Sequence, residues 1–223
     1  MLIHLNDWFP VWLSFRVAIL SALLVSVTAV PLARLMEKKR FAGRDVVEAL
    51  ITLPLVLPPS VVGYGLLVVI GIHGPVGRFL GQFGYTLVFT WIAVVLAATV
   101  VAFPLMYQSS RAAFASVNPN LEKAARTLGA GELKIFFTVT LPLAWPGVMS
   151  GLVLAFARAL GEFGATLMVA GNIPGQTQTI PTAIYYAVQV GDQASANTLV
   201  GIITVFSFIL IFWVNHWNQK HLH

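Results

Sequence analysis

The chain has 223 residues, of which 58% are hydrophobic and only 9% are charged, and its formal net charge is +5. Its mean hydropathy of +0.84 is far above that of a soluble globular domain, and the length leaves no room for a separate soluble domain. Since the chain has no cysteine, disulfides, thiol chemistry and cysteine-ligated metals are excluded. We therefore expect an all-α integral membrane protein in which residues 1–223 form a single transmembrane domain.

Five stretches approach or exceed the roughly 20 apolar residues that a membrane-spanning helix requires. They lie at about 12–35, 49–72, 86–108, 146–170 and 196–217. The first is too long for the apolar region of a signal peptide, and its positive charges follow it instead of preceding it. This order predicts an uncleaved anchor whose N-terminus lies outside the cell.

The second span is the least regular. It contains Pro54, Pro58 and Pro59, and Ser60 follows directly. Each proline removes a backbone donor, and a membrane tolerates such breaks only where protein or a water-lined cavity receives the freed carbonyls. We expect Pro58, Pro59 and Ser60 to face the interior and to line a pathway through the bundle. A packed structural kink is the alternative for any single proline.

A polar segment at 109–141 separates the third and fourth spans. It gathers several of the few charges of the chain, namely Glu122, Lys123, Arg126, Glu132 and Lys134. Within it, apolar residues recur at helical spacing and form one stripe, made of Leu121, Ala124, Ala125 and Leu128. Asn118 and Pro119 supply a start signal, and Gly129 supplies a stop. The pattern predicts a short amphipathic helix that docks into a groove on a partner, whereas a helix resting on the lipid surface is the alternative.

The fourth span carries two charges near the middle of the membrane, Arg158 and Glu162. Their i, i+4 spacing places them on one helix face, so mutual neutralisation is the simplest interpretation. A role as a hinge or gate is the alternative, because Gly161 and Gly164 permit close helix approach. Thr166 is a candidate polar contact in the pathway, although ordinary helix packing would explain it as well.

The basic residues predict which side of the membrane each loop occupies. With an outside N-terminus, one side carries ten Lys and Arg residues and the other carries only Arg78. The ten are Arg34, Lys38, Lys39, Arg40, Arg44, Arg111, Lys123, Arg126, Lys134 and Lys220. This bias places 109–141 and the C-terminus in the cytoplasm. Because the charges are spread over separate loops, they do not indicate nucleic-acid binding.

No phosphate-binding loop of the G-x-x-x-x-G-K-[ST] type occurs, and no metal or hydrolase motif is present. We expect no catalytic residue, no metal site and no cofactor in this chain. Three classes of function remain: a transport subunit driven by a separate ATPase, a self-sufficient secondary transporter or channel, and an intramembrane enzyme. Five spans without a clear internal repeat favour the first, because an odd number of helices suits one half of a dimeric pathway.

The 109–141 segment resembles the EAA loop of ABC-transporter permeases, whose pattern is E-A-A, three residues, Gly, nine residues and I-x-L-P. The matching residues are Ala124, Ala125, Gly129, Leu141 and Pro142. Lys123 stands where the pattern has Glu, with Glu122 one residue early, and Val139 replaces Ile. By this resemblance the segment would be the coupling loop that contacts the ATPase. The implied contacts are Glu122, Ala124, Ala125, Leu128, Gly129 and Ala130.

Nearly the whole chain resembles the permease subunits of bacterial molybdate ABC transporters. The resemblance lies in LPLVLPPSVVGYGLL (53–67), EKAARTLGAGELKIFFTVTLPLAWPGVMSG (122–151) and LAFARALGEFGATLMVAGNIPGQTQTIPTAIY (154–185). It implies a type I ABC importer permease fold in the bacterial inner membrane, and the pathway would form between two copies. The implied partners are an ABC ATPase dimer that binds ATP and Mg²⁺, and a periplasmic molybdate-binding protein. Tungstate or sulfate is the alternative cargo.

Overall fold

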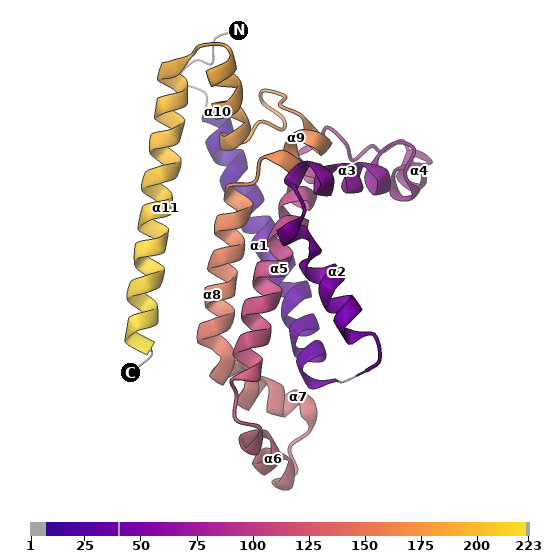
Figure 1. The fold of residues 1–223 in the computed structure, drawn as a ribbon, viewed down its shortest axis with the longest axis vertical. Helices are drawn as coiled ribbons and strands as arrows, with labels where there is room; N and C mark the ends of the chain where they lie inside the picture. The colour runs from indigo at the N-terminus through magenta and orange to yellow at the C-terminus, as the bar shows by residue number, and fades with distance from the viewer. Residues whose placement is uncertain (1–7, 40, 222–223) are drawn as a thin grey trace.

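The computed structural model describes residues 8–39 and 41–221, with the backbone alone for residues 213–221. In these ranges every regular element is a helix (Figure 1). The search of the described residues finds four helices long and apolar enough to cross a membrane, and one bent helix pair that could make a fifth span. This confirms the expected all-α fold, and it agrees with the five expected spans if the bent pair is counted as one of them.

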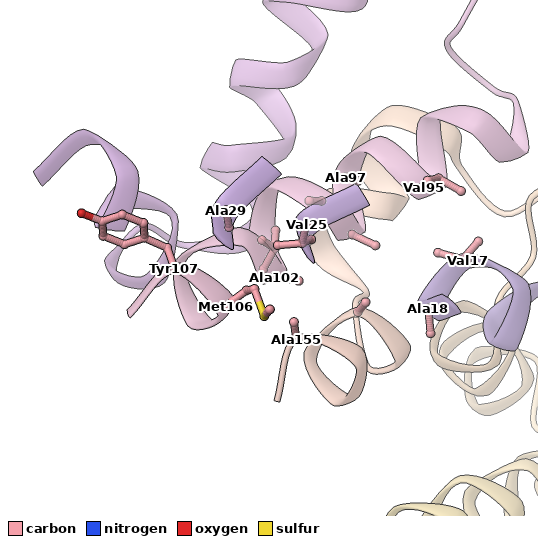
Figure 2. Packing of buried hydrophobic residues seen from close by; sticks show 14 of the residues in the cluster. Val17, Ala18, Val25, Ala29, Val95, Ala97, Ala102, Met106, Tyr107 and Ala155 are labelled. Carbon is pink, nitrogen blue, oxygen red and sulfur yellow. The ribbon is translucent and has the colours of Figure 1, made fainter. Parts of the chain in front are cut away.

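Three long helices form the centre of the bundle: α1 (Phe9–Lys38), α5 (Trp91–Ala115) and α8 (Leu141–Leu160). Helix α5 packs along both of the others. Figure 2 shows that small side chains dominate this core, among them Ala18 and Ala29 of α1 and Ala97 and Ala102 of α5. Small residues let membrane helices approach closely, because van der Waals packing replaces the hydrophobic driving force between helices in lipid.

Helix α8 meets α5 through two glycines. A Cβ atom built on Gly147 would lie 2.5 Å from the Cβ of Ala113, and one built on Gly151 would lie 2.8 Å from the Cβ of Ser109. Both distances are too short for real carbon atoms, so only glycine fits at these crossings. The two helices are therefore held at a separation that no other residue at these positions would permit.

The second span is broken. Helix α2 (Arg44–Val56) and helix α3 (Pro59–Ile70) meet at an angle of 118°, so the stretch expected as one span at 49–72 turns sharply (Figure 1). Leu57 and Pro58 are extended, with ψ angles of 142° and 138°. A residue that precedes a proline is pushed out of the helical region, and two consecutive prolines impose this twice. Helix α4 (Pro75–Gly81) follows α3.

The fourth span also differs from the range expected at 146–170. A continuous helical run begins at α7 (Glu132–Ile135), passes through a π-helical turn at Phe136–Thr140 and continues as α8. It ends at Leu160, and α9 (Gly164–Ala170) follows as a separate helix. Because α5 extends to Ala115 and this run starts at Glu132, the polar segment outside these long helices is shorter than 109–141.

The last two helices are α10 (Ile180–Gln189) and α11 (Gln193–His221). Helix α11 packs mainly on α10, and it contacts the bundle through Phe206, whose ring centroid lies 4.6 Å from that of Phe15 on α1 (Figure 1). A hydrogen bond of 2.8 Å from the backbone N–H of Ile180 to the Ser14 hydroxyl ties α10 to α1. Helix α1 begins at the end of the molecule opposite to the one where α11 ends (Figure 1). The terminal residues 1–7 and 222–223, for which an outside and a cytoplasmic position were expected, lie outside the described residues.

Candidate functional site

The polar segment folds into helix α6 (Pro119–Thr127), which projects beyond the bundle at one end (Figure 1). The Asn118 side chain accepts a hydrogen bond of 3.0 Å from the backbone N–H of Asn120, and Pro119 occupies the first helical position. At the other end Gly129 adopts a φ of +80°, in the left-handed region that terminates helices. The start and stop signals of the sequence therefore act where they were expected.

The apolar stripe of α6 points away from the rest of the chain. Leu121 is 46% exposed and Leu128 is 88% exposed, while Ala124 and Gly129 are exposed and Ala125 and Ala130 are half-buried. A helix that covers its own bundle would bury such a stripe. The geometry instead leaves an apolar face free for another molecule.

The buried face of α6 is polar, and Glu122 is its centre. One carboxylate oxygen accepts hydrogen bonds from Arg34 of α1 at 2.6 Å and from the Thr140 hydroxyl of the π-helical turn at 2.7 Å. The other accepts from Arg126 at 3.2 Å. Burial alone would raise the pKa of Glu122, but the Thr140 hydrogen bond and the charge of Arg34 outweigh it, so the pKa lies below its ordinary value. Glu122 therefore joins α6, α1 and the run that leads into α8.

Further ion pairs surround Glu122 and link the ends of α6, α7 and α1. Arg34 also contacts Glu37 at 2.8 Å, and Glu132 of α7 pairs with Arg126 at 2.6 Å and with Lys38. The sequence signalled the charged residues of the loop but not Arg34, which was interpreted only as part of the positive-inside bias. No local sequence pattern could reveal this contact, because 88 positions separate Arg34 from Glu122. We call these ionic contacts around Glu122 and Glu132 the junction.

A second candidate region lies where α3, which follows the break in the second span, meets α9, which follows the end of α8; this region is well away from α6 (Figure 1). Helix α3 packs against α9 so closely that a Cβ atom on Gly164 would lie 2.7 Å from the Cβ of Pro59. A Cβ on Gly63 would lie 2.7 Å from the Cβ of Met168. The break before α9 thus packs directly on the break before α3. Discontinuous helices that meet in this way are typical of transport pathways in membrane proteins.

The charged pair predicted in the fourth span forms beside this crossing. The Arg158 guanidinium lies 2.7 Å from a Glu162 carboxylate oxygen, at ion-pair distance but without hydrogen-bond geometry. Glu162 is not on the same helix as Arg158, because it lies past the last residue of α8. Its second oxygen accepts a hydrogen bond of 2.8 Å from the backbone N–H of Ala165 and so caps the start of α9. The pair therefore holds the break in shape.

The four other predicted pathway residues lie nearby in different surroundings. Thr166 on α9 is buried, and its hydroxyl has no hydrogen-bond partner among the described residues. Pro58, Pro59 and Ser60 at the α2–α3 break are exposed in the single chain. No group of three His, Asp or Glu side chains within the described part of the chain is placed to hold a metal ion.

Known transport proteins match this chain over nearly its whole length. Residues 29–222 match the family described as "Binding-protein-dependent transport system inner membrane component". The molybdenum transport system permease protein ModB of Escherichia coli strain K12 is 44% identical over 215 residues, which cover 96% of this chain and 94% of that protein. The sulfate transport system permease protein CysT of Salmonella typhimurium is 32% identical over 206 residues, which cover 91% of this chain and 74% of that protein.

Solved structures agree on the fold. A chain from a structure of inward-facing conformations of the MetNI methionine ABC transporter superposes with a TM-score of 0.74 at 17% identity, and the match covers 95% of this chain and 94% of that chain. At this identity the likeness shows the type I importer permease fold alone. The family match and the identity to the permeases are the stronger observations. The chain belongs to the family of binding-protein-dependent transport system inner membrane components.

Proposed function

We propose that this chain is the membrane-spanning permease subunit of an ATP-driven molybdate importer. The observation that carries the proposal is the orientation of α6, whose polar face is anchored to its own chain while its apolar face is free. A short helix with an unpartnered apolar stripe suits a groove on another protein. In this proposal α6 is the coupling helix, it lies in the cytoplasm, and the groove belongs to a separate ABC ATPase that binds ATP and Mg²⁺.

The contact with the ATPase would be made by the free face of the coupling helix, at Ala124, Ala125, Leu128, Gly129 and Ala130. Glu122 was expected among these contacts, but its carboxylate faces Arg34 and Thr140 of its own chain. We therefore give Glu122 a positioning role. When the ATPase moves the coupling helix, the junction transmits the movement to α1 and α8, because Glu122 is bonded to both the end of α1 and the turn that precedes α8.

The pathway would form between two copies of the chain. In each copy, the crossing of α3 and α9 would supply the moving part of the pathway. The residues at one break are Pro58, Pro59 and Ser60, and those beside the other are Arg158, Glu162 and Thr166. Because Glu162 neutralises Arg158, the pair holds no strong net charge that would trap an anion. A weak site of this kind suits a permease, since a tightly bound anion would leave slowly. The two sets of residues would act as a gate when the breaks move relative to each other.

Molybdate is proposed as the cargo because the identity to a molybdenum permease is 44%, against 32% to a sulfate permease. A periplasmic molybdate-binding protein would deliver the anion and supply most of the selectivity. The polar segment 176–181 would offer that protein little surface, because Thr177, Gln178 and Thr179 are buried. Tungstate and sulfate share the charge and tetrahedral shape of molybdate, so they are the alternative cargoes.

The test is uptake of radiolabelled molybdate by cells with and without this gene, with excess unlabelled sulfate or tungstate as competitor. We expect deletion to abolish energy-dependent molybdate uptake, and we expect sulfate not to compete in wild-type cells. Retained molybdate uptake with lost sulfate uptake would overturn the cargo and keep the permease. Uptake that persists without the partner ATPase would instead support a self-sufficient secondary transporter or channel.

A further inference from the structure

A groove lies beside the end of α1, and although Arg34, Lys38 and Glu132 of the junction line it, the proposed transport cycle gives its cavity no role. It is a cavity of about 380 Å³ between the last turns of α1 and the run formed by α7 and the π-helical turn. This volume is within the range of about 300–1,000 Å³ that is typical of small-molecule sites. One wall is apolar, with Leu35, Leu133 and Phe137, and the rim carries Lys38, Lys39 and Glu132.

The length of α1 indicates at which level of the membrane the groove lies. Trp12 is 60% exposed near the start of this helix, where aromatic side chains mark the membrane interface. From Trp12 to Leu35 a helix rises about 35 Å at about 1.5 Å per residue, slightly more than the roughly 30 Å of hydrocarbon. Leu35 therefore lies at the opposite boundary, and Lys38 and Lys39 lie at the level of the lipid headgroups.

The apolar wall of the groove is open in the single chain. Leu133 is 77% exposed, Phe137 is 62% exposed and Leu35 is 48% exposed. At the hydrocarbon boundary such a surface meets acyl chains instead of water. The wall therefore suits the upper part of a lipid tail.

The rim is basic. Lys38 pairs with Glu132, and Arg126 shares that same carboxylate, so the negative charge at the rim is already neutralised. Lys39 is exposed and takes part in none of the ion pairs of the described residues. A free ammonium group above an apolar wall at the headgroup level is complementary to a phosphate that carries an acyl chain. Basic grooves between helices on the cytoplasmic side are recurrent sites for anionic lipids.

We propose that this groove binds one anionic phospholipid of the cytoplasmic leaflet, with its phosphate at Lys39 and Lys38 and one acyl chain against Leu133 and Phe137. The site rests on the cytoplasmic orientation proposed above but not on the identity of the transported anion. Since Glu132 belongs to both the rim and the junction, the bound lipid would sit directly beside the contacts that hold the coupling helix.

The test uses the complex of this chain with its partner ATPase, reconstituted into phosphatidylcholine vesicles. A small fraction of phosphatidylglycerol carries a photoactivatable group in its acyl chain, and mass spectrometry locates the label. We expect label on the peptides that contain Leu133 and Phe137, displaced by unlabelled phosphatidylglycerol but not by phosphatidylcholine. Lys39→Gln should lower the labelling about five-fold, the factor that one lysine contributes near an anionic surface. Leu133→Ser, which trims the apolar wall, should lower it as well.

Lys134→Gln is the matched control, because Lys134 is exposed on α7 but does not line the groove. It removes the same charge and should leave the labelling unchanged. Equal labelling by a phosphatidylcholine probe, or competition by free glycerol phosphate, would overturn the proposal, as would absence of label from the groove. ATP-driven anion uptake by the same vesicles reports the transport function separately, so failure of the lipid site and failure of the permease are distinguishable.

Discussion

The carboxylate of Glu122 decides which face of α6, the proposed coupling helix, is left exposed. Amphipathic surface helices normally turn their apolar face toward their own core. Here Arg34 and Thr140 bond the polar face instead, so Leu128 is left 88% exposed. One buried carboxylate with three donors thus reverses the usual orientation, and it makes the apolar stripe available for docking.

We expect Glu122→Gln to weaken coupling more than binding of the ATPase. The amide keeps the shape of the carboxylate but loses the charge that faces Arg34 and Arg126, which should cost roughly 1–3 kcal/mol of stability. Uptake per ATP hydrolysed should fall several-fold in vesicles, while the ATPase remains attached. Lys123→Gln is the control, because Lys123 is the next residue, exposed and outside the junction. Equal losses in both variants would contradict the positioning role.

The lowered pKa of Glu122 predicts the pH range over which the junction is stable. Because the folded pKa lies below the ordinary value of 4.5, the stabilisation is complete above about pH 4.5 and is lost as the pH falls through the folded pKa. Thermal unfolding of the purified chain should show a constant difference between wild type and Glu122→Gln from pH 7 to pH 5. The difference should shrink only on further acidification. A decrease already between pH 7 and pH 6 would refute this assignment.

At the scale of elements, local sequence signals predict the bounds of the coupling helix, whereas its surroundings depend on residues far away in the chain. Asn118, Pro119 and Gly129 act within one turn of where they stand, so the sequence alone predicts where the helix starts and ends. The 118° turn after Leu57 could be anticipated as a break from its prolines, but the direction of the turn depends on packing against α9. The contacts of Glu122 depend on Arg34, 88 positions away, and no periodicity in the loop reports such a pair.

Gly129 ends the coupling helix through its backbone conformation alone. Its φ is +80°, and a Cβ atom built on it would meet nothing within 4 Å. Space is therefore available for a side chain, but a β-branched residue resists the left-handed region that asparagine tolerates. We expect Gly129→Val to leave membrane insertion intact and to lower ATP-driven uptake strongly, whereas Gly129→Asn should retain most of it. Similar uptake by the two variants would show that the turn is not required.

The crossing of α3 and α9 offers a matched pair of glycines on one helix. A Cβ on Gly63 would lie 2.7 Å from the Cβ of Met168 and 2.9 Å from the Cα of Ala165, whereas one on Gly65 would meet nothing within 4 Å. We expect Gly63→Ala to destabilise the chain by roughly 1–3 kcal/mol through overpacking and to reduce uptake. Gly65→Ala should be neutral in both assays. Thermal unfolding and uptake of the two variants measure this, and a harmless Gly63→Ala would remove the close crossing from the proposed gate.

At the scale of the whole molecule, the separation of the two regions is the main feature. The coupling helix lies at one end of the bundle and the crossing of the broken helices lies toward the other (Figure 1). Composition and hydropathy predicted four of the five spans as single helices, because each of these is long enough to be recognised by itself, whereas the remaining one is a bent helix pair. They could not predict that α11 packs mainly on α10 and contacts the central helices so little, since that depends on contacts between residues far apart in the chain. A helix with so little of its surface buried in one chain is available to lipid or to a second copy.

We expect the two regions to lie on opposite sides of the membrane, and this can be tested directly because the chain has no cysteine of its own. Leu128→Cys places one thiol on the free face of the coupling helix, and Gln82→Cys places one after α4, at an exposed position. A membrane-impermeant maleimide should label Leu128→Cys only in inside-out vesicles and Gln82→Cys only in right-side-out vesicles. Added ATPase should protect Leu128→Cys and leave Gln82→Cys unchanged. If both positions reacted from the same side, the ten-to-one distribution of basic residues would have to be explained without the positive-inside rule, and the coupling helix could not reach a cytoplasmic ATPase.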